Sequence, residues 1–247
     1  MDVAEARPRL AALGFAPGDV EVLAEHFLWA ERTGRLGHGL SRIEWLETWD
    51  SLELEARPQR VLSEPGYERW DGNGALGYLT LFEVVRAQLV DPPPHARVVV
   101  CSRTFPTGAL GYWVRMLAAA GLVGVLAATS PRRLGHPEGG PLLAGTNPLA
   151  IAIPSSDGQP VVTDVSMGAI TYGDVIAGRA TMDELVPFGG AQPHKAFALA
   201  VGLQLLVDSL TPEDEFGAVL IVARPESDPV PELRELAAGA RLPGSNP

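Results

Sequence analysis

The stretch Arg97-Val98-Val99-Val100-Cys101-Ser102 is the segment that most restricts the fold. Successive small apolar side chains without alternation are typical of a strand that is buried on both faces of a sheet. A helix is expected over residues 108–120, and a second strand of the same kind over 122–129. This β-α-β alternation predicts an α/β chain with a central mixed sheet and flanking helices.

Further elements are expected on both sides of this unit. Before it, apolar spacing predicts helices over 3–12, 17–34, 40–52 and 75–90, and residues 56–70 are interpreted as a connector. After it, a Gly- and Pro-rich loop over 131–145 precedes paired strands over 149–154 and 160–165. Residues 174–184 are expected to be short and irregular. A buried apolar helix over 195–209, a strand over 218–223 and a short helix over 232–238 complete the chain.

Composition excludes several classes of function. The 247 residues carry a formal net charge of −11, which argues against nucleic-acid binding and against adhesion to anionic membranes. No targeting signal and no apolar run of spanning length is recognised, so we expect a cytoplasmic protein. The single cysteine and five scattered histidines predict neither a disulfide framework nor a metal site.

Lys195 is the only lysine in the chain and follows His194 at the start of an expected helix. Lysine and arginine are not interchangeable where a compact, rotatable charge is needed. The pair is therefore a candidate site, and a solvated lysine at a helix start is the alternative.

Two other groups of polar residues are candidates. His38 and Arg42 lie four residues apart, near enough to share one face of a helix. The alternative is that Arg42 pairs with a nearby glutamate on a solvated face. The Thr146 hydroxyl stands before an expected strand and suits the lining of a small-molecule pocket, with an ordinary strand-entry turn as the alternative. Asp164 and Ser166 end the following strand and suit ribose or phosphate contacts, but equally fit a helix N-cap. No Gly-x-Gly-x-x-Gly follows a strand, so the Rossmann fingerprint is absent.

Several motifs occur together in one order. They are Gly37-His38-Gly39-Leu40-Ser41-Arg42, Asp71-Gly72 through Gly77, Gly145-Thr146-Asn147-Pro148-Leu149-Ala150, Asp164-Val165-Ser166, and Gly189-Gly190 with His194-Lys195. The set resembles the type 2 malate/L-lactate dehydrogenase family, which includes ureidoglycolate and sulfolactate dehydrogenases and cyclic ketimine reductases. The resemblance extends over most of the chain.

The resemblance implies a non-Rossmann NAD(P)-binding fold and a homodimer with its site near the subunit interface. It also implies hydride transfer between NAD(P)H and a small 2-oxo or 2-imino carboxylate. The implied parts are a helical N-terminal segment over 1–70, an α/β cofactor-type domain over 71–188, and a C-terminal helix and strand over 189–247 packing back on the N-terminal part.

The matching motifs also imply roles for individual residues. Arg42 is expected to hold the substrate carboxylate, His38 to transfer a proton, and Lys195 to bind an anion. The residues expected at the cofactor are Gly108, Ala109, Thr146, Asp164, Ser166 and His194.

Departures from the family pattern concern the chemistry. The family reads Asn-Ser-x-His-Phe-Gly where this chain reads Arg103-Thr104-Phe105-Pro106-Thr107-Gly108, so Pro106 occupies the position of the family histidine. Proline has no titratable group. The chain is also short for the family, mainly between Tyr172 and Gly189.

Three functions are therefore weighed. The first is a diverged NAD(P)H-dependent reductase of a C=N or C=O bond in a specialised pathway. The second is a scaffold that has lost redox chemistry and catalyses a cofactor-independent cyclisation, lyase or isomerase step. The third is a non-catalytic partner of an active relative. Titration with NADH and NADPH separates the first from the others.

Overall fold

A computed structural model describes residues 2–212 and 215–244. Within these residues one sheet contains seven strands in the order β1-β2-β3-β9-β4-β7-β8, and β5 and β6 form a separate hairpin. The strands are β1 Gln59–Glu64, β2 Tyr67–Asp71, β3 Ala96–Ser102, β4 Val123–Ala128, β5 Leu134–Gly135, β6 Leu142–Ala144, β7 Leu149–Ile153, β8 Val161–Val165 and β9 Ala218–Ala223.

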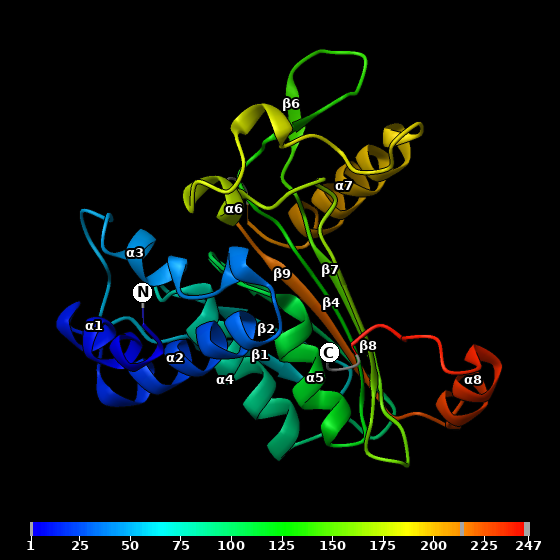
Figure 1. Ribbon diagram of the computed structural model, residues 1–247. Helices are drawn as coiled ribbons and strands as arrows, with labels where there is room; N and C mark the ends of the chain where they lie inside the picture. The colour runs from blue at the N-terminus through cyan, green and yellow to red at the C-terminus, as the bar shows by residue number, and fades with distance from the viewer. Residues whose placement is uncertain (1, 213–214, 245–247) are drawn as a thin grey trace.

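The α-helices are α1 Ala6–Ala12, α2 Pro17–Arg32, α3 Ser41–Leu46, α4 Gly77–Val90, α5 Leu110–Ala119, α6 Tyr172–Ile176, α7 Pro193–Asp208 and α8 Val230–Ala237. Short 3₁₀ turns lie at Val3–Glu5, Leu36–His38 and Met182–Glu184. Figure 1 shows α1 to α3 grouped beside the sheet, α4 and α5 packed along it, and α6 and α7 in an upper lobe with β6.

The sheet is mixed, as the sequence predicts. β2 and β3 are parallel, whereas β9 pairs antiparallel with both β3 and β4. β3 and β4 therefore run in the same direction without being hydrogen-bonded to each other. β8 pairs with β7, and β7 with β4, both antiparallel, so β2, β3, β4 and β8 all end at one edge of the sheet.

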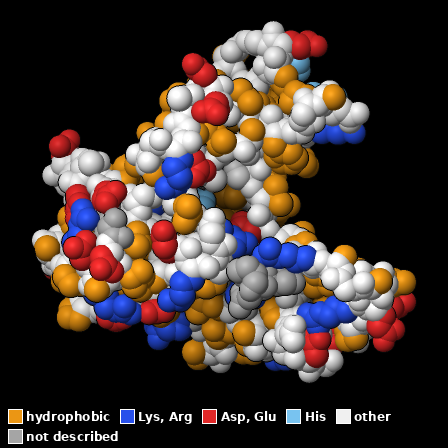
Figure 2. All heavy atoms as spheres, in the orientation of Figure 1, with side chains coloured by type: hydrophobic (Ala, Val, Ile, Leu, Met, Phe, Trp, Pro, Cys, Tyr) orange, Lys and Arg blue, Asp and Glu red, His pale blue; other side chains and the backbone are white. Residues whose placement is uncertain are grey.

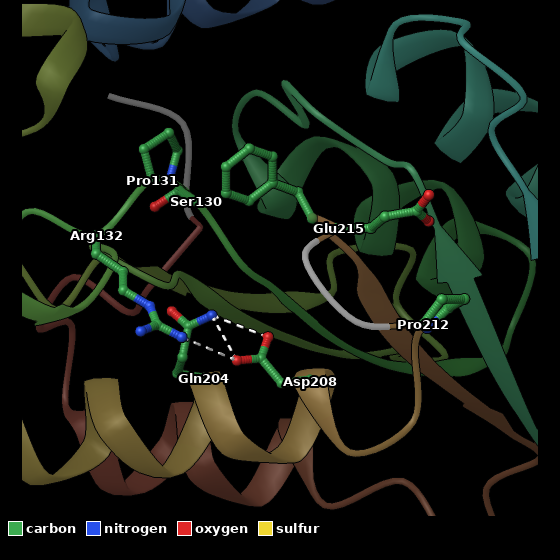
Figure 3. A pocket seen from close by; sticks show the side chains of 8 residues that line it. Ser130, Pro131, Arg132, Gln204, Asp208, Pro212 and Glu215 are labelled. Atoms are coloured by element: carbon green, nitrogen blue, oxygen red, sulfur yellow. Dashed lines mark hydrogen bonds and ion pairs between the residues drawn. The ribbon is translucent and has the colours of Figure 1, made fainter.

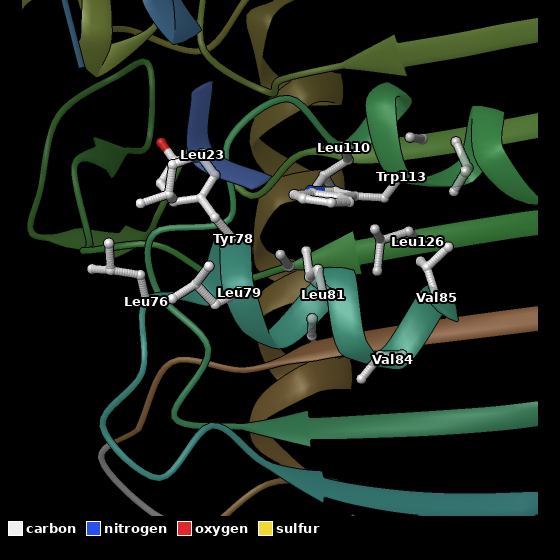
Figure 4. Packing of buried hydrophobic residues seen from close by; sticks show 14 of the residues in the cluster. Leu23, Leu76, Tyr78, Leu79, Leu81, Val84, Val85, Leu110, Trp113 and Leu126 are labelled. Atoms are coloured by element: carbon white, nitrogen blue, oxygen red, sulfur yellow. The ribbon is translucent and has the colours of Figure 1, made fainter. Parts of the chain in front are cut away.

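β3 is buried on both faces, which explains its unbroken apolar sequence. Val99 and Cys101 belong to the main core with residues of α4 and α5, part of which Figure 4 shows. Val100 lies in a second cluster with Val207 of α7 and Val219 of β9. Apolar side chains on both faces are what a strand between two helical layers requires.

The prediction that residues 56–70 form a connector is wrong, because this segment forms most of β1 and β2. β1 is an exposed edge strand, and Glu68 occupies a fully buried position in β2. Glu68 accepts hydrogen bonds from Trp70 Nε1 and Gln88 Nε2, both at 2.9 Å. Because Glu68 is a carboxylate at an inward-facing position, it interrupts the alternation of apolar residues by which a strand is recognised in a sequence. The Asp71–Gly74 turn consequently does follow a strand.

Two expected helices also differ from the structure. The third is much shorter than 40–52, since α3 covers only Ser41–Leu46. α7 is not buried within the single chain: Leu199 is 54% exposed and Leu205 63%. Its buried residues are Ala196, Ala200, Gln204 and Val207. Figure 2 shows hydrophobic side chains gathered on the side of the upper lobe where α7 lies.

The sequence predicts three parts, over 1–70, 71–188 and 189–247, and strands from all three lie in one sheet. β2 comes from the first part, β3 and β4 from the second, and β9 from the third. α7 packs on β4, β5 and β6. No helix among the described residues is both long and apolar enough to cross a membrane.

Candidate active site

A small cavity lies at the edge where β2, β3, β4 and β8 end. Its lining comes from the segments after β3, β4 and β8, from the segment before β7, from the turn before α3, and from α3 and the starts of α4 and α6. The lining residues are His38, Arg42, Tyr78, Phe105, Pro106, Thr107, Gly108, Ser130, Arg133, Thr146, Pro148, Ser166, Thr171 and Tyr172. Its volume is about 70 Å³. In α/β sheets, ligands commonly bind beyond the carboxyl ends of strands.

Arg42 supplies a buried positive charge to this cavity. The residue is 7% exposed, and Nε donates to the carbonyl of Gly37 at 2.8 Å. The guanidinium lies over the ring of Trp45, 5.0 Å from its centroid. Burial lowers the pKa of Arg42 from its usual value, but a guanidinium remains charged at neutral pH.

Within the described residues no carboxylate lies within ion-pair distance of Arg42. Glu44 and Glu47, the alternative partners on the same helix, lie against Arg9 instead. Asp174 acts on Arg42 only from beyond that distance and raises its pKa, and a buried charge without a close counter-ion is costly. An anionic ligand is the natural partner for it.

His38 lines the same cavity from the 3₁₀ turn that precedes α3. It therefore does not share a helix with Arg42, although the two side chains meet in one cavity. Its Nδ1 is buried and has no hydrogen-bond partner among the described residues. Burial, followed by the charges of Arg42 and Arg35, lowers the pKa of His38 to about 3. The imidazole is consequently neutral at pH 7.

Tyr78 lies in the first turn of α4 and is 1% exposed. Its hydroxyl is buried without a hydrogen-bond partner in the described part of the chain. Burial raises the pKa of the phenol, and the charge of Arg42 partly opposes this. Figure 4 shows the hydroxyl at the far end of the ring from α4.

The segment from β3 to α5 contributes Pro106 and Gly108. Pro106 is buried and presents no polar side-chain atom to the cavity. Gly108 has φ +70°, and a Cβ there would lie 2.3 Å from His26 Nε2 and 2.4 Å from the ring of Tyr78. Glycine is therefore required for the close approach of this turn.

Arg133 and Tyr172 form another side of the cavity. The Arg133 guanidinium lies 3.7 Å from the centroid of the Tyr172 ring. The first turn of α6 sits directly against the backbone before His38, because a Cβ on Gly173 would lie 1.8 Å from the Gly37 carbonyl oxygen. The cavity thus has two arginines and no carboxylate in its lining.

A larger cavity of about 390 Å³ adjoins the first. The two share His38, Gly108, Pro148, Ser166 and Thr171. Asp164 and Arg35 line only the larger one. The Asp164 carboxylate accepts from the backbone N–H of Gly111 at 2.9 Å and lies 3.7 Å from Arg35. Burial raises the pKa of Asp164. Asp164 therefore caps the N-terminus of α5.

The remaining expected cofactor residues occupy different positions. Thr146 and Ser166 both line the small cavity. The backbone N–H of Ala109 donates to His26 Nε2 at 3.1 Å, so it is already engaged. His194 and Lys195 are exposed in the first turn of α7 and line neither cavity. Their expected participation in the site stays a prediction.

Other cavities suit an anionic ligand less well. One of about 540 Å³ shares Ser130 with the small cavity, but it contains Asp208 and Glu215. Figure 3 shows Arg132, Gln204 and Asp208 pointing toward one another in it. Arg132 lies 3.8 Å from Asp208, so its charge is already paired.

Sequence reasoning missed Tyr78, Arg133, Tyr172 and His26. Tyr78 follows β2, which was not predicted, so nothing placed it at the ligand-binding edge. Arg133 lies in the segment between β4 and β5 and could have been found by its place after a predicted strand. His26 carried no signal, because a histidine on an apolar helix face is usually a core residue.

The fold is of the α/β class, and the lining of its small cavity contains two arginines and no carboxylate. A family model described as malate/L-lactate dehydrogenase matches residues 4–183. The chain belongs to this family.

Curated relatives are only partly covered by the chain. It is 30% identical over 192 residues to a 2,3-diketo-L-gulonate reductase of Citrobacter koseri, covering 73% of this chain and 55% of the relative. It is 29% identical to a Δ1-pyrroline-2-carboxylate/Δ1-piperideine-2-carboxylate reductase of Pseudomonas syringae, covering 80% of this chain and 65% of the relative. The chain thus spans between about half and two thirds of the length of these relatives.

Solved structures confirm the fold. The Δ1-piperideine-2-carboxylate reductase of Pseudomonas syringae superimposes with a TM-score of 0.83 at 24% identity, over 98% of this chain and 89% of that one. The malate dehydrogenase of Pyrococcus horikoshii gives 0.79 at 19% identity, over 97% and 80%. The predicted non-Rossmann fold of this family is therefore confirmed.

Proposed function

We propose that this chain is an NAD(P)H-dependent reductase of a small 2-imino or 2-oxo carboxylate. The observation that carries the proposal is Arg42, a buried guanidinium that lines a cavity without any carboxylate. Its planar fork can bind a substrate carboxylate through two parallel hydrogen bonds. The C=O or C=N carbon of a 2-oxo or 2-imino acid is bonded directly to that carboxylate, so the reacting bond is held in the same cavity.

The residues of the larger cavity fit a nicotinamide nucleotide. Asp164, Ser166 and Thr171 offer acceptors and hydroxyls of the kind that ribose hydroxyls need. The shared boundary of the two cavities, which includes Gly108 and Ser166, is the expected place of the nicotinamide. When bound, the nucleotide supplies the hydride.

His38 is expected to contact the substrate as a neutral imidazole. Its pKa of about 3 excludes a substantial imidazolium fraction at pH 7. The proton-transfer role expected from the family motif would then use a neutral N–H, as would a simple hydrogen bond to the substrate. The His38→Gln variant retains a hydrogen-bond donor and an acceptor but has no group that titrates. It therefore distinguishes a role that depends on size and polarity from one that depends on titration.

The test measures nucleotide binding and turnover separately. NADH and NADPH are titrated into the protein while nicotinamide fluorescence is followed. Turnover is then assayed with pyruvate, oxaloacetate and Δ1-piperideine-2-carboxylate by loss of nicotinamide absorbance. Saturable binding of one nucleotide and reduction of at least one of these carboxylates are expected. A folded protein that binds neither nucleotide contradicts the proposal.

Pro106 is the observation that favours a cofactor-independent reaction as the second candidate. It places an apolar ring in the cavity at the position of the family histidine. A cyclisation, lyase or isomerase step in the same carboxylate-binding cavity would not require a hydride donor. Binding of oxamate, a carboxylate probe, together with no nucleotide binding would favour this second function.

A further inference from the structure

We propose that Tyr78 is the catalytic proton donor of this site, in place of the imidazole that the chain lacks at Pro106. This inference rests on the proposed reductase function. Its basis is the position of the Tyr78 hydroxyl, which is buried and unpartnered within the described residues, on a side chain that lines the same small cavity as Arg42 and Pro106.

The surroundings hold the Tyr78 ring in one place. His26 packs edge-on at 5.0 Å between centroids, and Phe27 packs edge-on at 5.1 Å. The Gly108 turn closes the third side, since a Cβ at that position would lie 2.4 Å from the ring. A ring fixed on three sides directs its hydroxyl with little loss of conformational entropy when the substrate binds.

The unpartnered hydroxyl is informative because such groups are uncommon in folded proteins. Burying a hydroxyl without a hydrogen bond destabilises the fold. A phenylalanine would fill the same space without that penalty. A polar group that is retained against stability is typical of a functional site.

Tyr78 suits proton donation better than the neighbouring His38. His38 is neutral at pH 7 because its pKa is about 3. The O–H of a phenol is a stronger acid than the N–H of a neutral imidazole. Arg42, whose charge favours ionised Tyr78, would stabilise the phenolate that remains after donation.

A bound reduced nicotinamide would supply the hydride to the substrate carbon, and the π electron pair of the C=O or C=N bond would move to oxygen or nitrogen. That atom takes the Oη proton of Tyr78, which forms the new O–H or N–H bond. The phenolate is then reprotonated by water. One hydride and one solvent proton are consumed per turnover.

The test compares Tyr78→Phe with Tyr112→Phe. Tyr112 is a partly buried phenol in the same aromatic cluster, 4.8 Å from His26 between ring centroids, but it lies outside the cavity. Tyr78→Phe is expected to reduce kcat for pyruvate by about 10²- to 10⁴-fold, the usual worth of a positioned acid. The loss should be smaller for Δ1-piperideine-2-carboxylate, whose ring nitrogen can be protonated before it binds. Tyr112→Phe should retain the activity of the parent.

Two measurements without turnover separate a catalytic from a structural role. The thermal midpoint of Tyr78→Phe should equal or exceed that of the parent, and its nucleotide affinity should be unchanged. A lowered midpoint with weakened nucleotide binding would show a structural role, and unchanged kcat would also overturn the inference. If the parent binds no nucleotide, the proposed function fails and the role of Tyr78 falls with it.

Discussion

Arg42 shows how a strongly acidic chain can still bind an anion. The whole chain carries a net charge of −11, yet the lining of the small cavity contains two arginines and no carboxylate. Local charge in a cavity of low dielectric dominates over distant surface charge, which water and salt screen. The net charge therefore argues against polyanionic partners and not against a small carboxylate.

Arg42→Lys is expected to weaken binding of oxamate by at least tenfold while the chain remains folded. Lysine retains the charge but loses the planar fork and the stacking on Trp45. Isothermal titration calorimetry measures the affinity. Arg9→Lys, on the solvated side of α1, is the matched control and should bind oxamate normally. Equal affinities in the two variants would remove Arg42 from the anion site.

At the scale of elements, β2 shows why a strand escaped prediction. Its inward positions are Glu68 and Trp70 rather than two apolar residues. Glu68 lies 3.4 Å from Arg97, whose side chain is also buried. Trp70 and Arg60 also contact the carboxylate, but its buried partners Gln88 of α4 and Arg97 of β3 lie 20 residues or more away in the sequence. Local pattern cannot report a partner at that distance.

Glu68→Gln is expected to lower the free energy of unfolding by about 1 to 3 kcal/mol, because buried Arg97 would lose one of its two carboxylate partners and keep only the exposed Asp91. Urea denaturation followed by circular dichroism measures the change. Glu64→Gln on the exposed strand β1 should change stability by less than about 0.5 kcal/mol. Similar losses in both variants would mean that burial of Glu68 does not decide the effect.

α7 is the element whose environment differs most from expectation. Its sequence is apolar nearly all round, yet Leu199, Leu205 and Leu206 are 54%, 63% and 46% exposed. A helix of this composition needs cover on more than one side, and among the described residues its main contacts are with β4 and with the β5–β6 hairpin. A second copy of the chain is the occupant expected from the family resemblance.

Light scattering at micromolar concentration should therefore give about twice the chain mass of 26.2 kDa. Leu205→Glu on α7 should shift the mass toward that of a single chain, because it places a charge in the apolar contact. Leu236→Glu on α8, where the side chain is 76% exposed, is the control and should leave the mass unchanged. A parent mass near 26.2 kDa contradicts the dimer.

At the scale of the whole molecule, two buried histidines link stability to pH. Burial lowers the pKa of His26 well below its usual value and that of His38 to about 3. In the unfolded chain both titrate near 6.5. Between these limits the unfolded state binds more protons than the folded state, so the free energy of unfolding falls as pH decreases below about 6.5.

His38→Gln should reduce this acid sensitivity between pH 6.5 and 4.5. One titrating histidine contributes at most about 1.4 kcal/mol per pH unit. Urea unfolding at several pH values measures the slope for the parent and the variant. His95→Gln changes an exposed histidine and should leave the slope unchanged. A slope that is also unchanged in His38→Gln would mean that this imidazole titrates normally in the folded state.

The sequence by itself determined the α/β class, the strands β3, β4, β7, β8 and β9, and the helices that surround them, because their apolar patterns are local. It also identified His38, Arg42, Gly108, Thr146 and Ser166, which the structure brings to one cavity. The family motifs supplied their order along the chain, and the comparison with relatives confirmed the family.

Only the tertiary structure decided how these parts meet. It placed β9 between β3 and β4, so that four strands end at the edge that holds the site. It added Tyr78 and Arg133 to the cavity and left Lys195 exposed outside it. These outcomes depend on strand pairing and on long-range side-chain contacts, whose free energies come from residues far apart in the chain and leave no local pattern.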